Sequence, residues 1–137
     1  MSYLLDTNVV SELRRKEPDP HVVQWFEVVD SAELYISVLV VGEIRKGIEL
    51  LRRRGDTKQA SAIDRWLGGL KDKFGNRLIA VSMAICERWG TLSAGQPLTV
   101  VDGLLAATAI EHGLTLVTRE RGALTATGAI LLDPWAA

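Results

Sequence analysis

The feature that most constrains the fold is a short apolar run at the start of the chain that ends at an acid. Tyr3, Leu4 and Leu5 lead directly into Asp6-Thr7-Asn8, after which apolar residues resume. This pattern predicts a buried strand that ends in a tight turn into a helix. Open α/β sheets bind their ligands beyond the carboxyl ends of their strands. Asp6 therefore has two interpretations: it is the N-cap of the next helix, or it is a carboxylate for metal or phosphate chemistry.

The rest of the chain alternates between short apolar runs and longer segments of helical periodicity. After the first strand, further strands are expected at residues 33–37, 77–81, 114–118 and 129–132, and helices at residues 9–14, 20–31, 38–53, 57–73, 82–94 and 99–112. Strands that are separated by helices of this length form parallel sheets. The pattern predicts one α/β domain over residues 1–137, in which a mostly parallel sheet of four or five strands carries helices on both faces. The helix at 99–112 is apolar on nearly all sides and is expected to be buried at the centre.

The amino-acid composition excludes several classes of protein. The net charge of −1 excludes a uniformly basic nucleic-acid-binding domain, although it allows a local basic patch. No apolar run approaches the ~20 residues of a membrane span, and no signal peptide is evident, so a cytoplasmic protein is expected. Two histidines and one cysteine are too few for a zinc site. Cys86 cannot form an internal disulfide, and a buried, inert thiol in a reducing compartment is expected.

Four acids stand where an apolar element changes character. Asp6 follows the first strand, Glu43 lies at the edge of the apolar stripe of its helix, Asp102 lies near the start of the buried helix, and Glu120 follows the fourth strand. Each also has a plain structural interpretation. Thr99 and Asp102 fit a capping box, Glu43 fits a surface ion pair, and Glu120 fits a solvated turn.

Taken together, the four acids predict a common site. Parallel strands bring Asp6 and Glu120 to one edge of the sheet, and the flanking helices direct Glu43 and Asp102 toward the same edge. Carboxylates crowded in this way repel one another unless they are protonated or neutralised by a divalent cation. Oxygen ligands favour Mg²⁺ or Mn²⁺, which can activate water for phosphodiester hydrolysis. Hydrogen-bond donors that would hold the acids in place are Thr7, Asn8, Ser37 and Thr118.

Four motifs in order resemble the PIN-domain ribonucleases, and in particular the VapC-type toxins of toxin–antitoxin pairs, including the FitB-like branch. They are Asp6-Thr7-Asn8, Val41-Gly42-Glu43-Ile44, residues 101–109 and Val117-Thr118-Arg119-Glu120, and Asp133-Pro134-Trp135 resembles the ending of that branch. The resemblance covers essentially the whole chain.

The resemblance implies a PIN-like three-layer fold and a Mg²⁺- or Mn²⁺-dependent endoribonuclease. It assigns metal binding to Asp6, Asp102 and Glu120, and a catalytic role to these three and Glu43, which would bind the ion directly or through water. It also implies a homodimer and a cognate antitoxin that covers the acidic cleft, with contact to DNA only through the antitoxin. The chain departs from the family at the fourth acid, because the family usually has aspartate where Glu120 stands, and many members have another where this chain has Ala123.

Basic and aromatic residues offer candidates for contacts with RNA. Arginine and lysine side chains could bind phosphates around the cleft, or they could simply cover solvated helix faces. The candidates are Arg14, Arg15, Lys16, Arg45, Lys46, Arg52, Arg53 and Arg54. The four tryptophans could stack on bases, although Trp25, Trp66 and Trp89 lie in apolar helical patterns that favour the core or an interface.

Two other functions fit the same residues. The domain could be a weakly active or inactive partner that works mainly within a DNA-bound antitoxin–toxin repressor complex, as the glutamate at position 120 allows. A phosphatase of another α/β type also begins with an acid after its first strand. That class requires a second aspartate two residues later, where this chain has Asn8.

Overall fold

Five short strands, all parallel, form the sheet in the computed structural model, which describes residues 1–136. Their order across the sheet is β3-β2-β1-β4-β5, so the predicted parallel sheet is confirmed. In the register, Leu4 lies opposite Tyr35 of β2 on one side and Leu116 of β4 on the other. The strands are β1 (Tyr3–Leu5), β2 (Leu34–Ser37), β3 (Leu78–Ile79), β4 (Thr115–Val117) and β5 (Leu131–Leu132).

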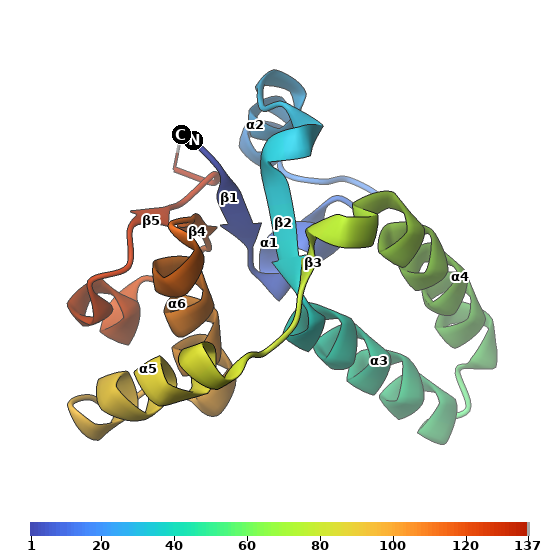
Figure 1. The fold of residues 1–137 in the computed structure, drawn as a ribbon. Coiled ribbons are helices and arrows are strands. Elements are labelled where there is room, and N and C mark those ends of the chain that lie inside the picture. Colours follow the sequence, from blue (N-terminus) through green and yellow to red (C-terminus); the bar gives the residue numbers. More distant parts are fainter. Residues whose placement is uncertain (137) are drawn as a thin grey trace.

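Within residues 1–136, six α-helices surround the strands (Figure 1). They are α1 (Thr7–Glu12), α2 (Pro20–Val28), α3 (Val38–Arg53), α4 (Thr57–Phe74), α5 (Met83–Ala94) and α6 (Val100–His112). The predicted bounds of α3 are confirmed, whereas α1 begins two residues earlier than expected because Asp6 caps it. The α2 helix ends at Val28, before the predicted 31, since Asp30 caps a separate 3₁₀ turn at Ser31–Glu33.

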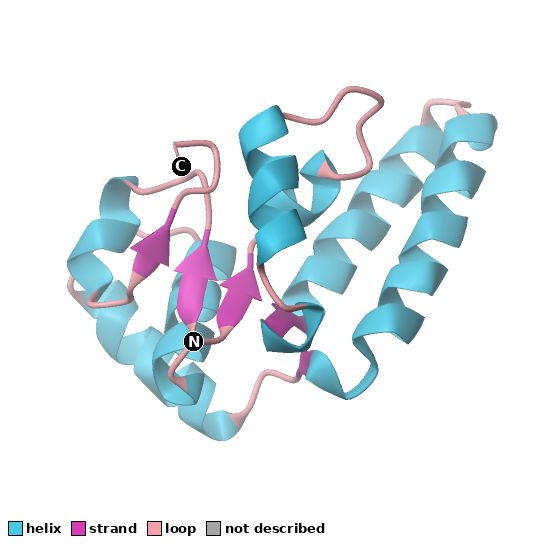
Figure 2. Ribbon diagram, turned by 90° about the horizontal axis from the view of Figure 1, so that it is seen from above, coloured by secondary structure: helices cyan, strands magenta, loops and turns pink. Residues whose placement is uncertain are grey.

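Helices α3 and α4 pack against each other, as do α5 and α6. The two pairs lie on opposite sides of the molecule, and the strands run between them (Figures 1 and 2). Val40, Ile44 and Ile48 form the buried stripe of α3. The predicted burial of the 99–112 helix is confirmed, because α6 buries a nearly continuous run of small and apolar residues from Gly103 to Ala109.

The carboxyl ends of the strands share one edge of the sheet, because all pairings are parallel. β1 lies at the centre, and the chain builds outward through β2 and β3 on one side and through β4 and β5 on the other. The reversal falls between β1 and β4, which is where doubly wound sheets open a ligand crevice. Asp6 follows β1 and Thr118 follows β4 at this point.

The environment of the single cysteine differs from the one predicted from the sequence. Cys86 is exposed on α5, so the expected burial of this thiol is wrong. None of the helices in residues 1–136 combines the length and the apolar character that crossing a membrane requires.

Candidate active site

Asp6 anchors the site. Its side chain is only 7% exposed, and its backbone N–H donates to the carbonyl of Val117 at 3.0 Å, which ties it to β4. One carboxylate oxygen, Oδ1, accepts from the N–H of Thr7 at 2.6 Å, so Asp6 is the N-cap of α1. The capping interpretation is thus confirmed, but it leaves Oδ2 free for a second contact.

That second contact comes from the neighbouring strand. Thr118 is fully buried just beyond β4, and its hydroxyl donates to Asp6 Oδ2 at 2.8 Å. The same hydroxyl oxygen accepts from the N–H of Glu120 at 3.1 Å. A single threonine therefore orients the Asp6 carboxylate and fixes the backbone that carries Glu120.

Glu43 and Asp102 approach Asp6 from helices on opposite sides. Glu43 is exposed on α3, and its carboxylate accepts a hydrogen bond from the hydroxyl of Thr7. Asp102 is half-buried in the first turn of α6, where its backbone N–H donates to Thr99 Oγ1 at 3.2 Å, as expected for a capped helix start. Both carboxylates lie close enough to Asp6 to repel its charge.

The pKa of Asp6 is raised above its ordinary value of 3.8. Burial is the largest cause, since it disfavours the charged form, and the negative charges of Asp102 and Glu43 act in the same direction. The hydrogen bonds from Thr118 and Thr7 oppose the shift. The site therefore holds a carboxylate whose negative charge a nearby cation would stabilise.

Glu120 is exposed beyond β4 and lies beside Asp102. The two acids line a small hollow of about 90 Å³ at the start of α6, which Ala123 also lines. Asp102 is thus close enough to Asp6 to repel its negative charge, and it lines the same hollow as Glu120.

The donor chemistry of these four residues fits a divalent cation, because all are oxygen ligands of the kind that Mg²⁺ and Mn²⁺ prefer. In the described part of the chain, however, no three acidic, histidine or cysteine side chains stand close enough together to hold an ion as they are. Glu43 and Glu120 are exposed and Asp102 is half-buried. Asp102 and Glu43 thus lie near Asp6, and Glu120 lies near Asp102, but the four acids are not arranged in a coordinating geometry.

The predicted supporting donors lie in different places. Thr7 and Thr118 contact Glu43 and Asp6 as described. The Ser37 hydroxyl instead accepts from the N–H of Leu39 at 3.1 Å and caps α3. Asn8 is exposed and lines a hollow of about 440 Å³ on the other side of α1.

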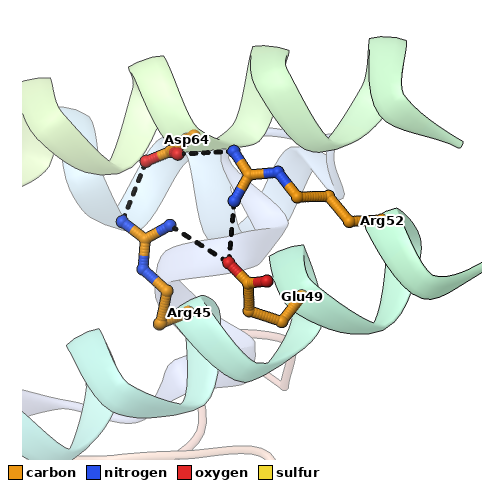
Figure 3. A network of polar contacts seen from close by, with 4 residues as sticks. All are labelled: Arg45, Glu49, Arg52 and Asp64. Atoms are coloured by element: carbon orange, nitrogen blue, oxygen red, sulfur yellow. Dashed lines mark hydrogen bonds and ion pairs between the residues drawn. The ribbon is translucent and has the colours of Figure 1, made fainter.

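The predicted RNA-contacting basic residues also separate into two groups. Arg14 and Arg15 line the hollow beside Asn8. Arg45 lies instead in a network between α3 and α4, where Asp64 accepts from Arg45 at 2.9 Å and from Arg52 at 2.8 Å (Figure 3). These contacts lower the pKa of the Asp64 carboxyl below its ordinary value. Lys46 is exposed on α3.

Sequence analysis missed Glu12 and Arg119. Glu12 is 5% exposed, and its carboxylate accepts from Arg15 at 3.3 Å and from the N–H of Asp19 at 2.8 Å. The available signal was its position one helical turn after buried Val9, which places Glu12 on the inner face of α1. Arg119 lies over the ring of Trp135, with 5.0 Å between the guanidinium carbon and the ring centroid.

A protein-family model matches most of the chain. The model of the PIN domain covers residues 3–128 of the chain. The chain belongs to the PIN-domain family. Within it, the sequence is 34% identical to the plasmid stability protein StbB of Pseudomonas syringae pv. tomato, over 98% of this chain and 99% of the relative.

Two other relatives of this PIN domain carry informative names. Toxin FitB of Neisseria gonorrhoeae is 30% identical over 96% of this chain and 97% of its own length. The VapC ribonuclease Y4jK of Sinorhizobium fredii is 29% identical over 96% of each chain.

Solved structures agree with the fold. The crystal structure of FitAcB from Neisseria gonorrhoeae superposes with a TM-score of 0.89 at 29% identity, over 98% of this chain and 99% of the other. The structure of FitAB bound to an IR36 DNA fragment gives a TM-score of 0.87 at 28% identity, over 97% and 95% of the two chains.

Proposed function

We propose that this PIN domain is a divalent-metal-dependent endoribonuclease that acts as the toxin of a toxin–antitoxin pair. The observation that carries the proposal is the buried Asp6 carboxylate at the sheet edge, with Asp102 and Glu43 near enough to raise its pKa. The names of the relatives, a toxin and a VapC ribonuclease, support the same activity.

Each acid has a distinct role in the proposed reaction. Asp6, Asp102 and Glu120 would hold Mg²⁺ or Mn²⁺, and Glu43 would bind it directly or through water and orient the nucleophile. A bound divalent ion supplies activated water and neutralises the charge that builds on the phosphate. Thr118 keeps the Asp6 carboxylate in one orientation, and the Thr7 hydroxyl donates a hydrogen bond to the Glu43 carboxylate.

The expected partners follow from the charge of the site. A cognate antitoxin would present a basic side chain to the acids, since opposite potentials attract across an interface. The structure of FitAB bound to an IR36 DNA fragment supports a complex that contacts DNA, and we infer that this contact is made through the antitoxin. We further infer a homodimer in the cytoplasm.

The alternative is a domain with little or no nuclease activity that serves mainly in a DNA-bound repressor complex. The observation that favours it is the substitution pattern in the hollow beside Asp102, where Glu120 is the acid and Ala123 offers no further carboxylate. In that case the antitoxin-bound protein would retard operator DNA, and the free protein would leave RNA intact.

The decisive experiment incubates purified, antitoxin-free protein with structured RNAs in the presence of Mn²⁺ or EDTA. We expect cleavage with Mn²⁺, none with EDTA, and a loss of roughly 100-fold or more in rate for Asp6→Asn, since this change removes a ligand from the centre of the site. Cleavage that survives both EDTA and the substitution would rule out the proposed site.

A matched control is Asp64→Asn. It makes the same chemical change in the surface network between α3 and α4, away from the sheet edge. This variant should retain cleavage within about twofold of wild type, because surface ion pairs contribute little to a distant site.

A further inference from the structure

A second hollow, of about 440 Å³, adjoins the acids on the side of α1 that faces β4 and β5. We call it the Arg–Trp pocket. Its lining includes Arg14, Arg15, Arg119 and Trp135, together with Asn8 and the acids Glu12 and Glu120. Asn8 is two residues beyond Asp6, and Glu120 is one of the four acids of the candidate site. The pocket and the acids therefore share a wall.

The parallel sheet explains why these residues meet. Arg119 follows β4, and Trp135 follows the neighbouring strand β5 at the same edge of the sheet. The Asp133 carboxylate accepts from the N–H of Trp135 at 2.9 Å and so fixes the turn that presents the ring. The strand order thus brings two residues that are sixteen apart in sequence into one surface.

The charges of this pocket are largely available to a ligand. Within residues 1–136, neither Arg14 nor Arg119 takes part in an ion pair, and Arg15 pairs only with buried Glu12 at 3.3 Å. Arg45 and Arg52, by contrast, are neutralised by Asp64 and Glu49 in the network of Figure 3. Across the part of the chain that the structure describes, Arg14 and Arg119 thus stand beside the acids without a carboxylate partner, whereas Arg45 and Arg52 each have one.

The Arg119–Trp135 pair adds a flat surface to this charge. The guanidinium of Arg119 lies over the half-buried indole of Trp135. Proteins that bind single-stranded RNA stack unpaired bases on aromatic rings or on guanidinium planes, and they contact the phosphates with arginine or lysine. The pocket combines both features next to a candidate phosphodiesterase site.

We propose that the Arg–Trp pocket binds one nucleotide of a single-stranded RNA next to the phosphate that is cleaved, an inference that rests on the proposed ribonuclease function. The base stacks on the Arg119–Trp135 pair, and the phosphates contact Arg14 and Arg15. An acidic protein segment could form ion pairs with the arginines, but it would have no base to stack on the Arg119–Trp135 pair. Single-stranded RNA explains both features of the pocket.

The test measures binding without cleavage. A fluorescein-labelled single-stranded RNA of ten nucleotides is titrated with protein in EDTA and followed by anisotropy. Arg119→Gln and Trp135→Leu should each weaken binding about 5- to 100-fold, the range seen when one base-stacking contact is removed. Arg15→Gln should reduce the slope of log affinity against log salt by about 0.7, the amount expected for one lost phosphate contact.

Arg45→Gln is the matched control, since it removes the same charge from an arginine that Asp64 already neutralises. It should change RNA affinity less than twofold.

Trp135→Phe, which preserves most of the packing, serves as a second variant in case Trp135→Leu fails to fold. Loss of tryptophan quenching by unlabelled RNA in Trp135→Phe would support stacking on that ring.

The two proposals fail differently. RNA binding that depends on Arg119 and Trp135, in a protein that never cleaves RNA with Mn²⁺, supports the pocket and counts against the nuclease. Where cleavage occurs, Arg119→Gln should raise KM and leave kcat within about threefold, whereas Asp6→Asn lowers kcat. Equal effects of Arg119→Gln and Arg45→Gln would overturn the inference. So would pocket variants that keep RNA affinity but lose the antitoxin.

Discussion

Asp6 shows how one side chain serves structure and a candidate chemistry together. Its Oδ1 caps α1, and its Oδ2 is held by Thr118 from the adjacent strand. Capping is therefore no argument against a role at the site, because a carboxylate has two oxygens and several lone pairs. The cost of this arrangement is a buried negative charge beside two other acids.

The raised pKa of Asp6 predicts that the stability of the protein depends on pH. Because the pKa of Asp6 is raised in the folded protein, the stabilisation from its protonated form is fully present below the ordinary value of 3.8 and is lost as the pH rises through the raised pKa. Asp6→Asn cannot titrate. The free energy of unfolding of Asp6→Asn, relative to wild type, should therefore increase across this window and then level off, as measured by urea denaturation at a series of pH values.

A second variant, Thr118→Val, tests whether Asp6 is the group that causes this pH dependence. Thr118→Val removes the hydrogen bond that lowers the pKa of Asp6, so the upper end of the window should extend to higher pH. A difference between Asp6→Asn and wild type that does not vary with pH would contradict the prediction.

At the scale of elements, the α5–α6 contact determines where Asp102 stands. Gly103, the next residue, is buried against α5, and a Cβ at this position would lie 2.8 Å from Cδ1 of Trp89. Only a glycine lets the start of α6 approach the indole this closely. The position of Asp102 thus depends on a residue that carries no chemistry of its own.

Gly103→Ala should destabilise the protein by about 1–2 kcal/mol, because the overpacking exceeds what the helix gains from alanine. Gly90→Ala in α5 is the matched control. A Cβ there meets open space, so the change should be neutral or stabilising by up to about 1 kcal/mol. Urea denaturation measures both. Equal stability of the two variants would show that the contact relaxes without cost.

Across the whole molecule, the four acids come from four separate segments of the chain, and a cation would relieve the repulsion of Asp6 by Asp102 and Glu43. The structure gathers them by parallel pairing of β1 with β4 and by packing α3 and α6 on either side of that edge. An ion that binds only this folded arrangement must stabilise it by mass action.

We therefore expect Mn²⁺ to raise the thermal midpoint of the wild-type protein. At a concentration 100 times the dissociation constant, the gain in unfolding free energy is about 2.7 kcal/mol. Asp6→Asn should show little of this increase in a thermal melt, and NaCl at equal ionic strength should not reproduce it. An equal rise in both proteins would mean that the ion binds elsewhere.

Several features could be predicted from the sequence because they depend on local patterns. The strand before Asp6, the bounds of α3 and the buried character of α6 follow from apolar periodicity, and the start of α6 also from the capping residue Thr99. The parallel sheet follows from the alternation of strands and helices. These signals come from residues that are close in sequence, so they do not depend on contacts with distant segments.

Other features were decided only by the tertiary structure, since they depend on neighbours that are distant in sequence. The strand expected at 77–81 ends at Ile79 because that residue pairs with Ser37, the last residue of its partner β2. β5 begins at Leu131, two residues later than expected, where it pairs with Leu116 of β4. Arg45 and Arg119 have the same side chain, yet Asp64 neutralises the first, whereas Trp135 leaves the charge of the second available. Periodicity determined which segments would be buried, and only packing determined which charges would meet, because electrostatic interactions act through space rather than along the chain.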